Sequence, residues 1–175
     1  MRMGVLGLSA IMLGGCPAKQ APFASTPEPL AAETEAVSTA NSPSSVTEAL
    51  APTRVLSATD AERLRNNQGL TLQWISWEER GFANVKVQEG GVWTISGEQQ
   101  NDAGGLLTLN GHITEIGEDY LLIQGEIAII AAPDKDRFCS DDKLWRFAVT
   151  QDRKYYRLRE FEWCDSLTDY IDIYF

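Results

Sequence analysis

The feature that most constrains the fold is a series of short segments, from residue 69 onward, in which apolar and polar residues alternate. Successive side chains of a β-strand point to opposite faces, so a period of two predicts strands. Eight such segments are separated by breaks rich in Gly, Asp and Asn: 69–77, 82–89, 92–99, 106–116, 120–130, 144–150, 155–162 and 170–175. Short strands at this spacing predict an antiparallel, all-β domain.

One face of most predicted strands is apolar, as in the strand that contains Trp145 and Phe147. A sheet with one apolar face has to cover that face. We therefore expect an eight-stranded antiparallel meander that closes as a small barrel or folds into a sandwich. One short helix over 59–67 precedes the strands, with Thr59 and Glu62 at the spacing of a capping box.

Three glycines support the barrel. Gly97, Gly111 and Gly125 recur every 14 residues, each on the apolar face of its strand. Hairpins centred near Gly104 and Glu118 would align them in one row across the sheet. Glycine inside a strand often marks a bend or a close backbone approach, and a row of glycines curls a sheet. We interpret the row as a barrel corner; the alternative is a hollow left for a ligand.

Two cysteines, Cys139 and Cys164, lie in the fifth and seventh connections between the predicted strands. Alternate connections of an up-and-down meander fall at the same end of the sheet, so these two residues can meet. We predict a disulfide between them, which an oxidising compartment permits. The third cysteine, Cys16, then needs a role of its own.

Cys16 follows Leu-Gly-Gly at 13–15, and an apolar run over 3–13 comes after the basic residue Arg2. The run is too short to span a bilayer and has the length of an export signal. The arrangement resembles the lipobox of bacterial lipoproteins. That resemblance implies that 1–15 is a signal peptide and that Cys16 is acylated and anchors the protein in a membrane. In that family Asp after the cysteine favours the inner membrane, so Pro17 favours the outer membrane, facing the periplasm or the surface. The alternative is an ordinary secretory signal.

The composition changes after the signal. Residues 16–55 hold six of the seven prolines among Ala, Ser, Thr and Glu, a composition that predicts a disordered tether. Residues 56–175 are long enough for a single domain. They carry 21 acidic and 12 basic residues, a net charge of −9. A domain this acidic should repel nucleic acid.

Residues that could catalyse a reaction are scarce. His112, the one histidine, lies on a polar strand face with no nucleophile motif beside it, and one histidine with two paired cysteines makes no zinc site. The acidic residues of the long connection are interleaved with Lys and Arg and lack the glycine and the final glutamate of a calcium loop. They are Asp134, Asp136, Asp141 and Asp142. We therefore predict no metal, no cofactor and no enzymatic activity.

Loops on a rigid scaffold commonly carry recognition, so we expect binding at the disulfide end of the domain. The candidate binding residues are Phe138, Asp141, Asp142, Trp163, Asp165 and Asp169. Their acidity would suit a basic protein partner in the cell envelope. The outline is similar to that of small envelope lysozyme inhibitors: a lipoprotein with a short eight-stranded barrel and one disulfide. This resemblance makes lysozyme an example of such a partner.

The leading hypothesis is therefore a lipid-anchored envelope protein that binds or inhibits another protein. The alternative is a carrier that holds a small apolar ligand inside the barrel. The Gly-x-Trp of 91–93 resembles a lipocalin motif, although lipocalins place it in their first strand and here it falls near the third. An envelope enzyme is the least favoured hypothesis.

Overall fold

The structure is a computed structural model that describes residues 50–175. The expected signal peptide, the acylation site Cys16 and most of the expected tether lie outside the described residues. The ordered fold starts before residue 56, where we expected the domain to begin. Thr53 donates a hydrogen bond from its hydroxyl to the Ile113 carbonyl (2.5 Å), and strand β1 (Arg54–Val55) pairs in parallel with β5.

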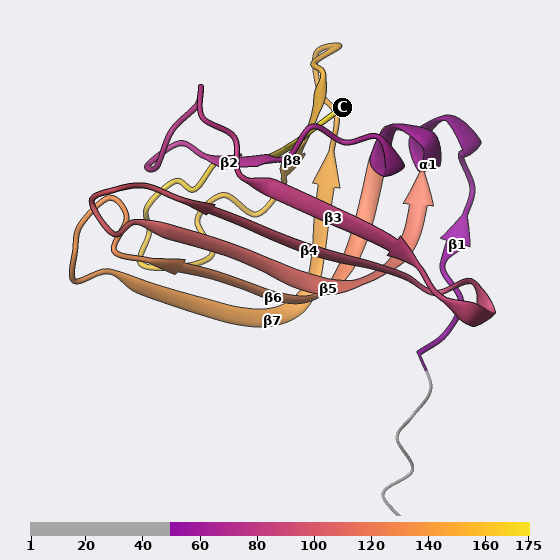
Figure 1. Cartoon of the computed structure of the whole chain (residues 1–175), viewed down its shortest axis with the longest axis horizontal. Coiled ribbons are helices and arrows are strands. Elements are labelled where there is room, and N and C mark those ends of the chain that lie inside the picture. The colour runs from indigo at the N-terminus through magenta and orange to yellow at the C-terminus, as the bar shows by residue number, and fades with distance from the viewer. Residues whose placement is uncertain (1–49) are drawn as a thin grey trace, which may run out of the picture. The chain divides into compact units, whose positions relative to one another are not determined.

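The expected antiparallel barrel is confirmed (Figure 1). Strands β3 to β9 are neighbours in chain order, each antiparallel to the next, and β2 pairs with β9. An isolated bridge from Leu70 to Gly81, just before β3, brings the two ends of the sheet together. The elements are β1, α1 (Ala58–Arg65), β2 (Leu70–Leu72), β3 (Phe82–Val87), η1 (Glu89–Gly91), β4 (Trp93–Gln100), β5 (Leu106–Gly117), β6 (Tyr120–Ile130), β7 (Phe138–Ala148), β8 (Tyr155–Leu158) and β9 (Ile171–Tyr174).

Two boundaries near the disulfide differ from the prediction. Strand β7 begins at Phe138, six residues before the predicted start, so Asp141 and Asp142 lie in a strand and not in a loop. The apolar alternation is missing from this half of β7, because polar residues occupy both of its faces, and the sequence pattern therefore missed it. Strand β8 ends at Leu158, and the chain leaves the sheet over residues 159–170, a segment that we call the strap.

Helix α1 covers the barrel end next to the β5–β6 hairpin (Figure 1). It begins one residue earlier than predicted, and the cap is Ser57, whose hydroxyl accepts a hydrogen bond from the Asp60 N–H (3.2 Å). The expected capping box of Thr59 and Glu62 is not formed. Within residues 50–175, no helix is long and apolar enough to cross a membrane.

A buried polar cluster joins α1 to the barrel. The Asp60 carboxylate accepts hydrogen bonds from the hydroxyls of Ser57 and Tyr156 (both 2.5 Å) and from Arg63 (2.9 Å). Burial by itself would raise the pKa of Asp60, but these hydrogen bonds outweigh it, so the pKa lies below its ordinary value. Burial of its ring and the hydrogen bond to the Asp60 carboxylate raise the pKa of Tyr156, which stays protonated.

The barrel interior is filled by its own side chains. Trp145, Tyr156 and Phe147 are the largest fully buried ones. Gly111 lies opposite Gly125, as expected. The expected row of three is wrong at Gly97, which lies opposite Leu109, two positions away from Gly111.

The shift of Gly97 arises in the β4–β5 turn. The Asn101 side chain accepts hydrogen bonds from the N–H groups of Ala103 (3.1 Å) and Gly105 (2.9 Å), which centres the turn one residue before Gly104. Neighbouring side chains fill the space beside the glycines. A Cβ on Gly97 would overlap Leu70, and the Trp145 indole donates a hydrogen bond to the Gly125 carbonyl (2.7 Å). These contacts agree with a tightly packed corner.

Candidate functional site

The predicted disulfide is present and fastens the strap to β7. Cys139 on β7 and Cys164 in the strap are bonded, with their Cα atoms 6.0 Å apart. Strand β8 pairs with β7 only through Phe147 and Ala148. The disulfide therefore holds the strap against the half of β7 that has no pairing with β8.

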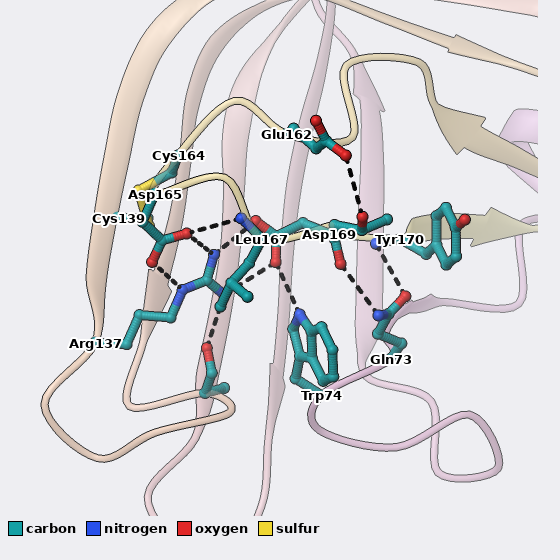
Figure 2. Close-up of polar contacts among 12 residues, drawn as sticks. Gln73, Trp74, Arg137, Cys139, Glu162, Cys164, Asp165, Leu167, Asp169 and Tyr170 are labelled. Carbon is teal, nitrogen blue, oxygen red and sulfur yellow. Dashed lines mark hydrogen bonds and ion pairs between the residues drawn. A yellow bond between two sulfur atoms is a disulfide. The ribbon is translucent and has the colours of Figure 1, made fainter.

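Directly before β7, the buried guanidinium of Arg137 binds two strap carboxylates (Figure 2). It donates hydrogen bonds to Asp165 (2.8 and 3.0 Å), to Asp169 (2.9 and 2.8 Å) and to the Ala132 carbonyl (2.8 Å). Asp169 is fully buried and accepts a further hydrogen bond from the Trp74 indole (2.9 Å). The hydrogen bonds from Arg137 hold the pKa of Asp165 below its ordinary value.

Asp165 and Asp169 were predicted to be binding residues, and in the structure both hold the strap through Arg137. Trp163, a third candidate, packs edge-on against Trp145, with ring centroids 5.2 Å apart. Its indole N–H is buried and has no hydrogen-bond partner among residues 50–175. These three side chains take part in the packing and hydrogen bonding of the disulfide end, and Asp165 remains 40% exposed. Their predicted role in binding stays a prediction.

Asp141 and Asp142 do not act as a pair, because neighbouring residues of a strand face opposite ways. Asp141 lies on the strap side of β7, 3.2 Å from the Lys143 ammonium, which also contacts Glu160 at 2.8 Å. Asp142 lies on the outer face and accepts a hydrogen bond from Gln124 (3.1 Å).

Apolar side chains form one row on the outer face of the sheet, at the end opposite α1. Phe138 is 68% exposed and lies opposite Ile130, which is 37% exposed and in turn lies opposite Leu106. Two rows further along the same face, Glu126 lies opposite Asp142. We call Leu106, Glu126, Ile130, Phe138 and Asp142 the Phe138 face.

The two carboxylates of the Phe138 face form no ion pair with the other residues of 50–175. Glu126 accepts a hydrogen bond from Ser140 (2.6 Å) and Asp142 accepts one from Gln124, but neither forms an ion pair with any described residue. Like charges directly opposite each other on a sheet are unfavourable. A cation from a binding partner would relieve this repulsion.

Sequence reasoning identified Phe138 and Asp142 but missed Leu106, Glu126 and Ile130. A signal for Ile130 was available: Ile129 and Ile130 are consecutive in a strand, so one of them has to face outward. Glu126 gave no such signal, because a lone glutamate on a polar strand face is common. His112 lies on the outer face, opposite Thr94 and Gln124. Within residues 50–175 the Thr94 hydroxyl accepts a hydrogen bond from Gln88 and none from His112.

Comparison with known proteins places the chain in a family. A family model described as the PM1083 family matches residues 52–175, which is the described domain and includes the Phe138 face. The chain belongs to the PM1083 family. It is 38% identical over 115 residues to "Uncharacterized protein PM1083" of Pasteurella multocida (strain Pm70), which covers 65% of this chain and 74% of that relative. No solved structure matches this chain.

Proposed function

We propose that this PM1083-family protein is a lipid-anchored binding protein of the bacterial cell envelope, and that its Phe138 face recognises a basic protein. The observation that carries the proposal is the Glu126–Asp142 carboxylate pair, which has no ion pair among residues 50–175 and lies two rows along the outer face from the exposed ring of Phe138. Exposed aromatic groups next to unneutralised charge are typical of interfaces, where the aromatic group supplies affinity and the charge selects the partner. We propose that the protein acts by binding and catalyses no reaction.

Rigidity of the surface supports this proposal. Strand β6 is paired on both sides, with β5 and with β7, along almost its whole length. The disulfide and Arg137 secure the strap behind β7. A surface that is already ordered loses little conformational entropy when a partner binds.

The filled interior favours protein binding over the carrier alternative. Trp145, Phe147 and Tyr156 occupy the core, so a ligand inside the barrel would have to displace them. A surface cavity of about 630 Å³ beside α1, lined in part by Arg63 and Phe175, lies outside the barrel. It offers no enclosure of the kind that apolar carriers use.

The test is photo-crosslinking in the native host. A photoreactive phenylalanine analogue at Ile130 should capture a basic protein, and Glu126→Lys with Asp142→Lys should abolish the product. A matched control, Glu89→Lys with Glu118→Lys, makes the same change of net charge at exposed carboxylates that form no ion pair within residues 50–175. Equal loss in both double variants would mean that only net charge matters, and would refute the assignment of the site.

The anchor has a separate test. Cys16→Ala should move the protein from the membrane fraction to the soluble fraction, because removal of the acylated side chain removes the lipid. The lipid itself is checked by metabolic labelling with a fatty acid. A Cys16→Ala protein that stays in the membrane fraction, with an unlabelled wild type, would contradict the anchor.

A further inference from the structure

Strand β7 has a free edge along most of its length. On one side it pairs with β6 at every residue from Phe138 to Ala148. On the other side β8 pairs only with Phe147 and Ala148. In Figure 1 the first half of β7 is the outermost strand of the broad layer formed by β3 to β7.

Two backbone hydrogen bonds show which groups face this edge. Toward β6, Arg137 accepts through its carbonyl from the Ala131 N–H (2.8 Å); toward the strap, Arg146 accepts from Arg159 (2.8 Å). Residues of an antiparallel strand direct their N–H and C=O groups alternately to the two sides. Odd-numbered residues of β7 therefore bond to β6, and even-numbered residues face the edge. Before Arg146, these are Phe138, Ser140, Asp142 and Leu144.

The backbone groups of those four residues pair with no strand among residues 50–175. Such an edge is a template for another strand, and proteins guard it with Pro, charged side chains, a bulge or a covering loop. From Phe138 to Leu144 the edge has no Pro and no bulge. Its charged side chains are Asp142 on the outer face and Asp141 and Lys143 on the strap side. The Lys143 side chain lies on the strap side, over the Trp145 ring and 2.8 Å from Glu160, and the outward side chains include Phe138, 68% exposed, and Leu144, 48% exposed.

We propose that the free edge of β7 pairs with the same edge of a second copy of this chain, giving a two-fold symmetric dimer. This inference goes beyond the proposed function and does not depend on the basic partner. Two-fold dimers are the commonest oligomers, and their interface uses the same patch on both copies. The two sheets would join into one, and the Phe138 faces of both copies would lie side by side on its outer surface.

The order of residues along the edge selects one antiparallel register. With Phe138 opposite the partner's Leu144, Ser140 falls opposite the partner's Asp142. Symmetry repeats both pairs, so every outward N–H and C=O of the four residues gains a partner. The exposed apolar side chains contact each other, and each carboxylate meets a hydroxyl. A register shifted by two residues in one direction would place Asp142 opposite the partner's Asp142, which is a pair of like charges. A shift in the other direction would place the Phe138 ring opposite the carboxylate of the partner's Asp142. Both registers are therefore less favourable.

The experiment is sedimentation equilibrium of residues 16–175 carrying Cys16→Ser, the mature chain without its lipid. We expect a monomer–dimer equilibrium with a dissociation constant on the order of 10–100 µM, because the contact is small. Dimerisation should strengthen as salt rises, since both domains are strongly acidic and salt screens their repulsion. Binding of a basic protein to the Phe138 face should weaken under the same change, so the two proposals can fail separately.

Two variants test the edge itself. Ser140→Pro removes an N–H that faces the edge and leaves the ladder with β6 intact, so it should weaken dimerisation at least tenfold; Ser140→Thr, which keeps the N–H, should not. Leu144→Glu places a carboxylate opposite the partner's Phe138 and should also weaken dimerisation. Because Leu144 is exposed, this variant should fold, and it tests the edge even if Ser140→Pro does not fold. A wild type that stays monomeric at about 200 µM would overturn the proposal. So would a dimer that neither Ser140→Pro nor Leu144→Glu weakens.

Discussion

The Arg137 network provides the sharpest test of what holds the strap in place. Arg137→Met removes all five hydrogen bonds of the guanidinium and leaves Asp169 buried, with the Trp74 indole as its remaining side-chain donor. Removing one partner of a buried ion pair typically costs 3–5 kcal/mol, because the other charge stays uncompensated. Asp165 is 40% exposed, so Asp165→Asn should cost only about 1 kcal/mol.

Urea unfolding at pH 7, followed by tryptophan fluorescence with the disulfide intact, measures these free energies. Arg137→Lys is the matched control, because it keeps the charge and loses the two-pronged geometry, and it should lie between wild type and Arg137→Met. The double variant Arg137→Met with Asp169→Asn should be no less stable than Arg137→Met alone, because it also removes the buried Asp169 carboxylate that Arg137→Met leaves without its cation. A cost below about 1 kcal/mol for Arg137→Met, or strict additivity in the double variant, would refute the reasoning.

Three further outcomes are expected. Cys164→Ser should lower the free energy of unfolding by roughly 3–4 kcal/mol in the same urea assay, because the bond spans 25 residues; unchanged stability would contradict this. Asp60 and Asp165 have folded pKa values below their ordinary ones, so the unfolded chain takes up their protons first and stability should fall as the pH drops below about 4. Urea midpoints between pH 6 and 3 measure this, and Asp165→Asn should flatten the dependence. Gly97→Val should cost about 1–3 kcal/mol by overlap with Leu70, and Leu70→Ala in the same chain should recover part of it; independent effects would refute the contact.

Local patterns were sufficient to predict an antiparallel all-β meander with a covered apolar face, because alternation reports directly on a strand with one buried face. They left the choice between a barrel and a sandwich open. They were also sufficient for the disulfide, since Cys139 and Cys164 lie in alternate connections of a meander. The pattern failed where polar residues occupy both faces, as in the first half of β7, where Asp141 was assigned to a loop. It also failed where one side chain sets a turn, as Asn101 does for Gly97.

The candidate site was harder to predict, because contacts between residues distant in the sequence decide which of its charged side chains are bound and which stay exposed. Because Arg137 is surrounded in the sequence by aspartates and lysines, the sequence predicts a solvent-exposed side chain. In the structure Arg137 is buried and binds residues 28 and 32 positions away. Those bonds occupy Asp165 and Asp169, and no local rule could have separated them from Asp142, which remains exposed. Glu126 belongs to the surface only because the β6–β7 register sets it opposite Asp142.

The pairing of β2 with β9 has a consequence for how the protein is made. Residues 70–72, from the start of the domain, pair with residues 171–173. Their only nearer contacts with other barrel strands among the described hydrogen bonds are the bridge at Gly81 and a bond from the Leu72 N–H to the Gln99 side chain on β4 (2.5 Å). During synthesis the barrel therefore stays open until residue 173 has been made, and contacts of such long range form slowly. A chain that stops before residue 171 would keep the unpaired edges of β2 and β8, which expose it to proteases and to aggregation. The barrel can therefore close only after the whole domain has been synthesised.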